Sequence, residues 1–330
     1  MIKKRILSGM RPTGRLHLGN LQGALKNWVD LQNDGKNECF YFVADWHALT
    51  SDYSATDQIH ENIMEMILDW LSVGLDPEQS TLFVQSAIKE HAELYLLLGM
   101  ITPLAWLERN PTYKEMKDEL SGKDLSTYGF LGYPVLQAGD IIIYRGQGVP
   151  VGVDQLPHIE LTREIARRFN FLYGEEVFPI PEPLLTEAPK LLGIDGRKMS
   201  KSYGNSIYIS DEAGEVQTKV AAMFTDPQRI RRKDPGNPDI CNVYSFHWLY
   251  SAEEETARIN QECRTAGIGC TDCKKLLAEK IIAAMIPIHE RRRQLSNRLD
   301  DVRQIIAQGN LKASVVARET MEKVRNAMKI

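Results

Sequence analysis

The first 90 residues alternate β-rich runs with amphipathic helical segments, and this order constrains the fold more than any other feature. The runs at 4–10, 38–49 and 80–86 are short and apolar, which predicts buried strands. Between them, apolar residues recur at helical spacing in 17–33 and 55–75. This alternation predicts a parallel, doubly wound α/β sheet of the Rossmann-like type, which binds ligands at the carboxyl ends of its strands.

The remainder of the 330 residues adds further parts to this sheet. The pattern from about 91 to 140 predicts mostly helix. We expect this segment to be an insertion between two halves of the sheet. A strand and loop at 148–155 precede another helix, and the four prolines of Val177 to Lys190 predict a loop or linker. Strand patterns fade after Tyr203. We therefore expect an α/β catalytic domain at 1–205 and a C-terminal all-α domain at 206–330.

Composition excludes some classes of protein. No stretch approaches the ~18–20 uninterrupted apolar residues that a membrane span needs. The basic N-terminus lacks the apolar core of a signal peptide, so we expect a cytoplasmic protein with no membrane partner. The formal net charge of −4 provides no global basic field, so composition alone does not indicate a nucleic-acid partner.

A glycine-rich segment, SGMRPTGRLHLGN from Ser8 to Asn20, follows the first predicted strand and leads into a helix. Glycines allow a ligand to approach the backbone closely, and a helix N-terminus presents N–H groups to phosphate. His17 adds a further donor at the same place. Taken alone, the segment fits an ordinary turn with a surface histidine as well as it fits a phosphate site.

A second segment, KMSKS from Lys198 to Ser202, lies in a polar loop after the last predicted sheet element. Lys198 and Lys201 are three residues apart, with small hydroxyl residues beside them. Such a pair forms a mobile cationic clamp for a polyphosphate. A solvated charge run is the alternative for any pair of lysines.

The chain has five cysteines, and four of them form a C-x21-C-x6-C-x2-C array. The isolated Cys39 lies in an apolar run, where a buried thiol mostly contributes packing. Four thiols with one C-x2-C pair can close a tetrahedral site for Zn²⁺ or hold a [4Fe–4S] cluster, and the spacing does not choose between them. Scattered structural cysteines are the alternative. The array consists of Cys241, Cys263, Cys270 and Cys273.

The H-x-G-[HN] pattern at His17 to Asn20 and the KMSKS pentapeptide are the paired motifs of class I aminoacyl-tRNA synthetases. The whole chain resembles the bacterial tryptophanyl-tRNA synthetases, from SGMRPTG through YPVLQAGD and PVGVDQ to the last helix. Asn20 departs from the histidine of many class I members, but it still donates a hydrogen bond. The resemblance implies a ligase that activates L-tryptophan with ATP and Mg²⁺ and then loads tRNA(Trp).

The resemblance also implies which residues bind ATP. His17, Lys198 and Lys201 would be catalytic, with the lysines stabilising charge on the α-phosphorus and the departing pyrophosphate. The amino-acid carboxylate is itself the nucleophile, so positioning and electrostatic stabilisation supply the rate. The remaining contacts to the nucleotide would come from Arg11, Pro12, Thr13, Gly19, Asn20, Gly152, Val153, Asp154, Leu191, Met199, Ser200 and Ser202.

The implied tryptophan pocket centres on Asp140, which would accept the indole N–H. Tyrosyl enzymes share the pattern of Tyr133, Gln137 and Asp140, but they place a tyrosine where this chain has Leu7. Apolar residues at that position and nearby suit an indole, so the resemblance favours tryptophan over tyrosine. The other pocket residues would be Tyr133, Gln137, Gln155, His47, Leu7, Val149 and Val151.

Three more expectations come from the same resemblance. A subset of these enzymes carries a [4Fe–4S] cluster on a nearly identical array, which favours iron–sulfur over zinc. The helical domain would bind the tRNA anticodon. Independently of the resemblance, the basic loop of Arg229, Arg231, Arg232 and Lys233 fits a phosphate or anticodon contact as well as it fits a solvated charged loop. A homodimer would form through the helical insertion.

Two other classes of function remain as rivals. A nucleotidyltransferase shares the H-x-G-H core, but such chains are usually short and lack KMSKS with a helical tail. A non-catalytic paralogue that binds RNA has no reason to keep His17, Lys198 and Lys201 together.

Overall fold

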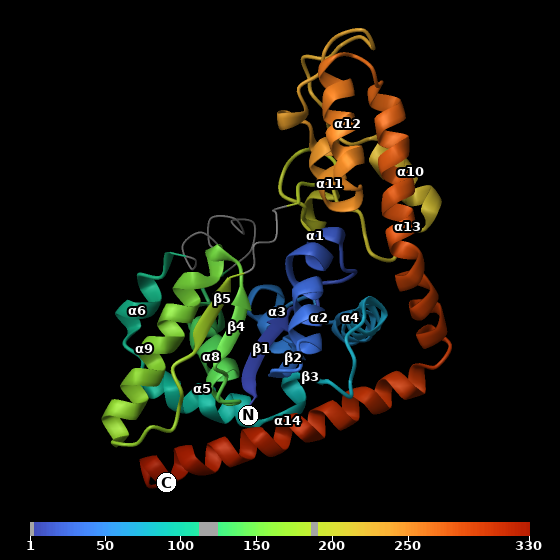
Figure 1. Cartoon of the computed structure of the whole chain (residues 1–330). Helices are drawn as coiled ribbons and strands as arrows, with labels where there is room; N and C mark the ends of the chain where they lie inside the picture. The colour runs from blue at the N-terminus through green and yellow to red at the C-terminus, as the bar shows by residue number, and fades with distance from the viewer. Residues whose placement is uncertain (1–2, 112–124, 186–190) are drawn as a thin grey trace. The chain divides into compact units, whose positions relative to one another are not determined.

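The computed structural model describes residues 3–111, 125–185 and 191–330 (Figure 1). Two compact units share the chain. The first comprises Met1–Gly14, Lys26–Glu187 and Leu295–Ile330, and the second comprises Arg15–Leu25 and Ala188–Gln294. Each unit is assembled from segments that are separate in the sequence.

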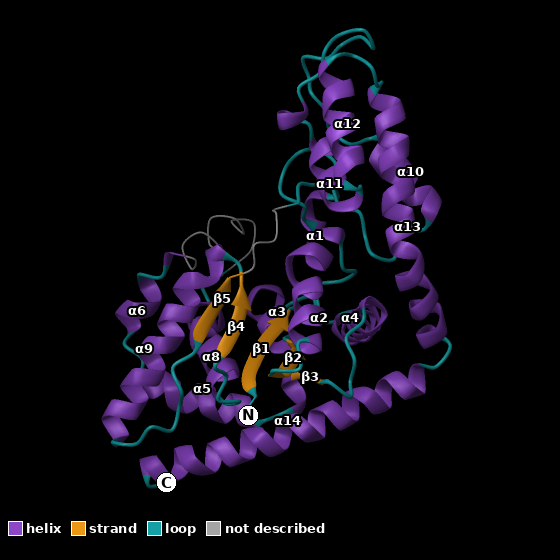
Figure 2. Cartoon of the chain, in the orientation of Figure 1, coloured by secondary structure: helices purple, strands orange, loops and turns teal. Residues whose placement is uncertain are grey.

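The first unit is built on a five-stranded parallel sheet, shown in orange in Figure 2, with the strand order β3-β2-β1-β4-β5. The order runs outward in both directions from β1, as expected for a doubly wound sheet. The α/β fold class predicted from the sequence is therefore confirmed. The strands are β1 (Lys4–Met10), β2 (Asn37–Val43), β3 (Ser80–Val84), β4 (Gly148–Val151) and β5 (Glu182–Leu185).

Two local predictions were wrong. The second strand ends at Val43, and the DWHALTSD segment forms helix α3 (Asp45–Asp52), in which Asp45 accepts the N–H of Ser86 at 3.0 Å. The proline-rich segment contains strand β5, which pairs with β4 so that Pro183 lies opposite Val149. Because β5 is an edge strand, proline removes a donor without breaking an inner ladder.

Helices surround the sheet, and the region between β3 and β4 is helical over its described residues, as predicted. A buried core joins the sheet to α8 (Tyr128–Ile142) and α9 (Leu156–Tyr173) through Phe40, Phe83, Val135 and Phe169. No helix in the described ranges is long and apolar enough to cross a membrane. The helices of this unit are α2 (Lys26–Asn33), α3, α4 (Ile59–Val73), α5 (Glu90–Ile101), α6 (Leu104–Glu108), α8 (Tyr128–Ile142), α9 (Leu156–Tyr173) and α14 (Leu299–Met328).

The last helix, α14, belongs to the sheet-bearing unit although it lies at the end of the chain. Gly309 packs so closely on β3 that a Cβ there would overlap the carbonyl oxygen of Leu82. The next residue, Asn310, accepts the N–H of Val84 at 2.9 Å. Helix α14 thereby covers an edge strand that would otherwise present unpaired groups.

The second unit is helical, in agreement with the loss of strand patterns after Tyr203. Its N-terminal piece pairs with a later segment, since Leu18 N–H donates to Ile207 O and Ile209 N–H donates to Leu16 O, both at 2.9 Å. Its elements are α1 (Leu18–Asn20), a π-helical turn η1 (Leu21–Leu25), η4 (Lys201–Tyr203), α10 (Ala213–Ala221), η5 (Pro238–Ile240), α11 (Asn242–Tyr250), α12 (Glu253–Arg264) and α13 (Cys270–Ser296).

Candidate active site

Asp140 on α8 is the centre of a buried polar network in the first unit. Its carboxylate is 1% exposed, and His47 on α3 lies 2.8 Å from Oδ2. His91 on α5 lies 2.6 Å from Oδ1, and Gln85 donates to both oxygens. Burial raises the pKa of Asp140, but the hydrogen bonds and charges of the two histidines outweigh this effect and leave it below its ordinary value. The site therefore holds an ionised acceptor among donors.

Sequence reasoning named Asp140 and His47 as candidates for this site but did not name Gln85 and His91. Both missed residues are fully buried, and His91 is anchored further by the Tyr144 hydroxyl, 2.7 Å from its Nε2. A polar residue placed directly after the apolar run of β3, as Gln85 is, was the one available signal, because side chains at the carboxyl ends of parallel strands converge.

Tyr133 lies seven residues before Asp140 on α8 and has a separate buried contact. Its hydroxyl is 3.1 Å from Nε2 of His158, and Nδ1 of His158 is 3.2 Å from the amide nitrogen of Asn110. Burial, with a smaller effect of the charge of His47, lowers the pKa of His158 to about 4. The imidazole is therefore neutral at pH 7 and orients the Tyr133 hydroxyl without adding charge.

The other predicted tryptophan residues lie in the same unit. Leu7 and Val149 are buried on the neighbouring strands β1 and β4, while Val151 and Gln137 are partly buried. Gln155 lies just beyond β4 in the short helix η3 (Val153–Gln155), where it donates to Asp154 at 3.1 Å.

The predicted nucleotide contacts of the first unit follow β1 and β4. Arg11 donates to the hydroxyl of Ser51, but its buried Nε has no hydrogen-bond partner within the described residues. Pro12 is buried and Thr13 is exposed. Gly152 directly follows β4, and Val153 and Asp154 are exposed beside it. Gly152 cannot be replaced without a shift, because a Cβ would lie 2.7 Å from Asp154 Oδ1.

The remaining part of the N-terminal motif lies in the second unit. Asn20 N–H donates to Nδ1 of His17 at 3.2 Å, and Asn20 Oδ1 accepts the His17 N–H at 3.0 Å. Burial and the charge of Lys201 lower the pKa of His17 to about 4. Because Nδ1 accepts a hydrogen bond, the neutral ring carries its proton on Nε2 and can donate from that atom.

The lysine loop lies beside this motif within the second unit. A Cβ at Gly19 would lie 2.9 Å from His17 Nδ1 and 3.8 Å from Met199 Sδ. Lys198 is exposed, Met199 is buried, and Ser200 and Lys201 are partly buried. Leu191 is buried, and its carbonyl oxygen accepts the Met199 N–H at 3.3 Å. The structure thus brings the two sequence motifs together.

The four cysteines of the array gather in the second unit. Cys241, Cys263 and Cys270 all act electrostatically on Cys273, and burial together with these neighbours raises the pKa of Cys273 to about 12. Arg229 Nη1 lies 3.9 Å from Cys263 Sγ and 3.8 Å from Cys270 Sγ. Within the described ranges, however, no three His, Cys, Asp or Glu side chains are arranged to hold one metal ion. The four cysteines lie near one another, but their side chains are not placed as the ligands of one metal ion.

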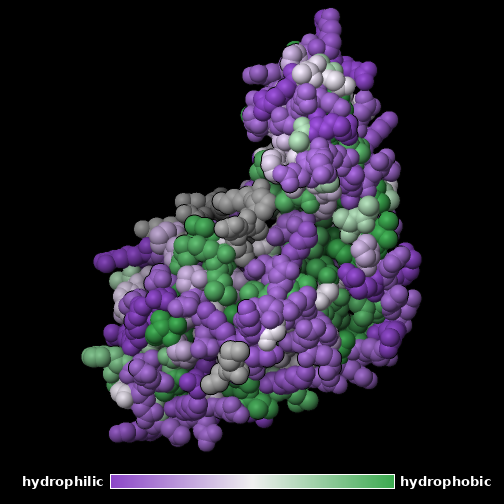
Figure 3. Space-filling model, viewed as in Figure 1, coloured by the Kyte–Doolittle hydropathy of each residue, from purple (hydrophilic) through white to green (hydrophobic). Residues whose placement is uncertain are grey.

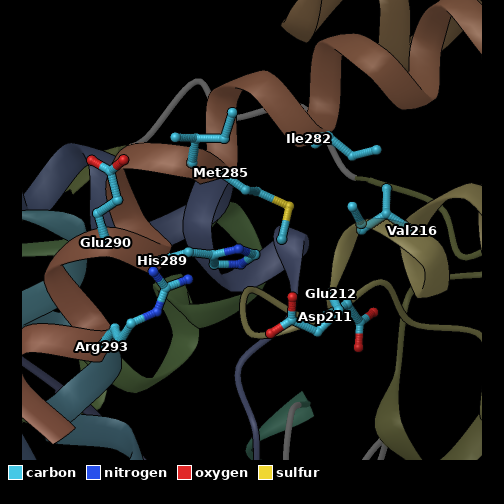
Figure 4. A pocket seen from close by; sticks show the side chains of 10 residues that line it. Asp211, Glu212, Val216, Ile282, Met285, His289, Glu290 and Arg293 are labelled. Atoms are coloured by element: carbon cyan, nitrogen blue, oxygen red, sulfur yellow. The ribbon is translucent and has the colours of Figure 1, made fainter. Parts of the chain in front are cut away.

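The same unit contains a cavity of about 320 Å³ between the start of α10 and the middle of α13 (Figure 4). Met285 and His289 point into it from α13, opposite Asp211 and Val216. His289 Nε2 donates to the carbonyl oxygen of Ile209 at 2.7 Å. No residue predicted to bind ATP or tryptophan lines this cavity.

Known proteins resemble the whole chain. The family model described as tRNA synthetases class I (W and Y) matches residues 3–285. The tryptophan–tRNA ligase of Thermotoga maritima is 56% identical over 99% of this chain and 99% of that protein. The ligase of Aquifex aeolicus is 47% identical over 99% and 100%, respectively. The tryptophanyl-tRNA synthetase of Campylobacter jejuni, solved with ADP and tryptophan, has a TM-score of 0.88 at 33% identity and covers 99% of this chain and 100% of that chain.

The chain therefore belongs to the class I tRNA synthetases for tryptophan and tyrosine. Within that family it groups with the bacterial tryptophan–tRNA ligases.

Proposed function

We propose that the chain activates L-tryptophan with ATP, releases pyrophosphate, and transfers the tryptophanyl group to tRNA(Trp) in the cytoplasm. Full-length similarity to tryptophan–tRNA ligases supports this reaction. The choice of tryptophan rests on the buried, ionised carboxylate of Asp140 together with the buried Leu7 of β1, which stands where tyrosyl enzymes have a tyrosine. An indole N–H would donate to this acceptor, whereas a side chain without a donor cannot form this hydrogen bond.

The tryptophan pocket in this proposal is formed around α8. Asp140 binds the indole nitrogen, and Tyr133 and Gln155 bind the ammonium group. Leu7 and Val149 form apolar walls from neighbouring strands. The pocket is completed by His47, Gln137 and Val151.

The nucleotide would be held by residues from both motifs. Arg11, Pro12 and Thr13 would line the phosphates, and Gly152, Val153 and Asp154 would contact the ribose. Further contacts would come from Gly19, Asn20, Leu191, Met199, Ser200 and Ser202. Mg²⁺ bound to the triphosphate would neutralise part of its charge.

Activation needs no general base, because the tryptophan carboxylate is already ionised. One carboxylate oxygen attacks the α-phosphorus, and the bond from that phosphorus to the bridging oxygen of pyrophosphate breaks. The neutral His17 donates from Nε2, while Lys198 and Lys201 stabilise the charge that develops on the phosphates. A terminal ribose hydroxyl of tRNA then attacks the activated carbonyl and displaces AMP.

ATP–pyrophosphate exchange with each of the amino acids tests this proposal. Exchange should depend on tryptophan and be far slower with tyrosine. Asp140→Ala should lower selectivity for tryptophan up to about tenfold, since a hydrogen bond contributes a net ~0.5–1.5 kcal/mol. The control is Asp300→Ala, which removes an exposed carboxylate on α14. Equal exchange with tyrosine would refute the assignment.

We also propose that the predicted domain at 206–330 contacts tRNA through those of its helices that lie in the second unit. The surface of the α11 and α12 region is largely hydrophilic in Figure 3, and the loop before η5 exposes Arg231 and Arg232. Basic groups of this kind pair with phosphates. Arg232→Glu should weaken tRNA charging while leaving pyrophosphate exchange intact.

The four cysteines are proposed to hold a [4Fe–4S] cluster, with Zn²⁺ as the alternative. Their spacing and their proximity in the second unit support a four-thiolate centre. The cluster would stabilise the loops that precede α11 and α13. Measuring the iron content and the visible absorbance of the protein would distinguish an iron–sulfur cluster from zinc.

A homodimer is the last proposal. Apolar side chains on α5 and the start of α6 and α8 are exposed, namely Leu96, Met100, Leu104 and Tyr128. Exposed apolar surface of this kind suits an interface between copies of the chain. Sedimentation should give twice the mass of one chain, and Met100→Lys should shift the measured mass toward that of a single chain.

A further inference from the structure

The carboxylate of Asp140 is already fully hydrogen-bonded without a substrate. Its Oδ1 lies 2.6 Å from His91 Nδ1 and 2.8 Å from Gln85 Nε2. Its Oδ2 lies 2.8 Å from His47 Nε2 and 2.9 Å from Gln85 Nε2. A carboxylate oxygen accepts at about two lone-pair positions, so each oxygen has its complement of donors. An indole N–H can reach Asp140 only in place of one of these donors.

Two of the three donors are fixed at both ends. The other ring nitrogen of His91 lies 2.7 Å from the Tyr144 hydroxyl, and neither residue is exposed. The Oε1 of Gln85 accepts the N–H of Trp46 at 3.2 Å, and Gln85 is also fully buried. Withdrawing either residue would break two contacts in the interior and leave polar atoms unpaired.

His47 differs from both. Its side chain is 11% exposed, the highest value among the three donors. No hydrogen bond to its Nδ1 is present within the described ranges. Moving His47 away therefore breaks one side-chain hydrogen bond, whereas moving either of the other two donors breaks two.

We propose that His47 occupies the indole position on Asp140 Oδ2 and is exchanged for the substrate N–H when tryptophan binds. This inference rests on the proposed function, in which Asp140 binds the indole. The exchange keeps the buried carboxylate paired at every stage. It also means that tryptophan gains only the difference between two hydrogen bonds, so His47 sets how strongly the site discriminates by the indole N–H.

The test compares tryptophan with 3-benzothienylalanine, which carries sulfur where tryptophan has N–H. The ratio of their dissociation constants is measured by calorimetry for the native chain, His47→Leu and His47→Gln. In His47→Leu, Oδ2 lacks a competing donor, so the preference for tryptophan should rise about tenfold, equivalent to ~1.4 kcal/mol. His47→Gln keeps an N–H donor and should stay near the native ratio. An unchanged ratio in His47→Leu would overturn the exchange.

A second measurement needs no variant. In the native chain labelled with ¹⁵N-histidine, tryptophan should shift the Nε2 resonance of His47, because its hydrogen bond to Asp140 is lost. The benzothienyl analogue should leave that resonance in place, and an equal response to both ligands would contradict the proposal. If the native chain binds both ligands equally and Asp140→Ala changes neither affinity, then the assignment of Asp140 to the indole fails as well.

Discussion

The buried side chain of Asn205 donates to the carbonyl oxygen of Lys198 at 3.1 Å, and its own oxygen accepts the N–H of Ser200 at 2.9 Å. The same amide nitrogen donates to Asp195 at 2.8 Å. One side chain therefore holds the lysine loop from both sides of Met199. The backbone is fixed while the Lys198 side chain remains exposed.

The first prediction concerns Asn205→Ala. Loss of the amide should let the loop shift, and small displacements of positioned groups reduce turnover strongly. We expect the rate of adenylate formation to fall about 10- to 100-fold, with little change in tryptophan affinity. Single-turnover kinetics and equilibrium binding measure the two quantities. The control is Gln217→Ala, which removes an exposed amide from α10. Weaker tryptophan binding with normal turnover would contradict the role.

The second prediction concerns the lysines themselves. Lys198→Ala and Lys201→Ala should each lower the rate of adenylate formation by about 100-fold or more, because the charge stabilises the transition state. Tryptophan affinity should be unchanged. Lys275→Ala on α13 is the matched control, since that lysine is exposed in the same unit. A variant with native turnover and weakened tryptophan affinity would show that the loop lies outside the phosphate machinery.

The third prediction concerns the four-cysteine array. Protein purified without oxygen should contain about four irons per chain on the cluster hypothesis and should bleach on oxidation. Cys270→Ser should remove the colour, retain most pyrophosphate exchange and impair tRNA charging. Cys39→Ser is the control, because Cys39 is buried in strand β2 of the other unit. Colourless protein with one zinc would refute the cluster but would still support a metal site on the four cysteines. Protein with neither metal would refute both the cluster and the metal site.

The sheet could be predicted from sequence because its strands are local apolar runs. β1, β2 and β3 each follow that pattern, and the order of strands and helices then fixes a parallel arrangement. β5 was not predicted, because the prolines in and around it are typical of a linker. Only its pairing with β4 makes Glu182–Leu185 a strand. α14 has an ordinary amphipathic pattern, so nothing local indicates that Gly309 packs on β3.

The residues of the candidate site also fall into those that local sequence predicts and those that it does not. Motif residues such as His17 and Lys198 are recognisable because their short sequence contexts are distinctive. The partners of Asp140 are not, since Gln85 lies 55 residues before it and His91 lies 49 residues before it. Pairing over such separations depends on how α5 and β3 pack around α8. Local periodicity carries no information about that packing.

The final prediction is a pH dependence of stability from His158. Burial and the charge of His47 lower its pKa from 6.5 to about 4. As the pH falls below about 6.5, the unfolded chain takes up a proton that the native ring does not. The stabilisation is therefore complete above that pH and is lost progressively toward pH 4. Between pH 7 and pH 5 this residue should reduce the free energy of unfolding by about 2 kcal/mol.

Urea denaturation at the two pH values measures this loss for the native chain and for His158→Gln, whose side chain does not titrate. The variant should lose about 2 kcal/mol less than the native chain between pH 7 and pH 5, whatever its stability at pH 7. His60→Gln is the control, because it makes the same substitution at an exposed histidine on α4. Equal losses in His158→Gln and the native chain would show that His158 takes up its proton in the folded state as readily as in the unfolded one. Its hydrogen bond to Tyr133 would then not depend on a neutral ring.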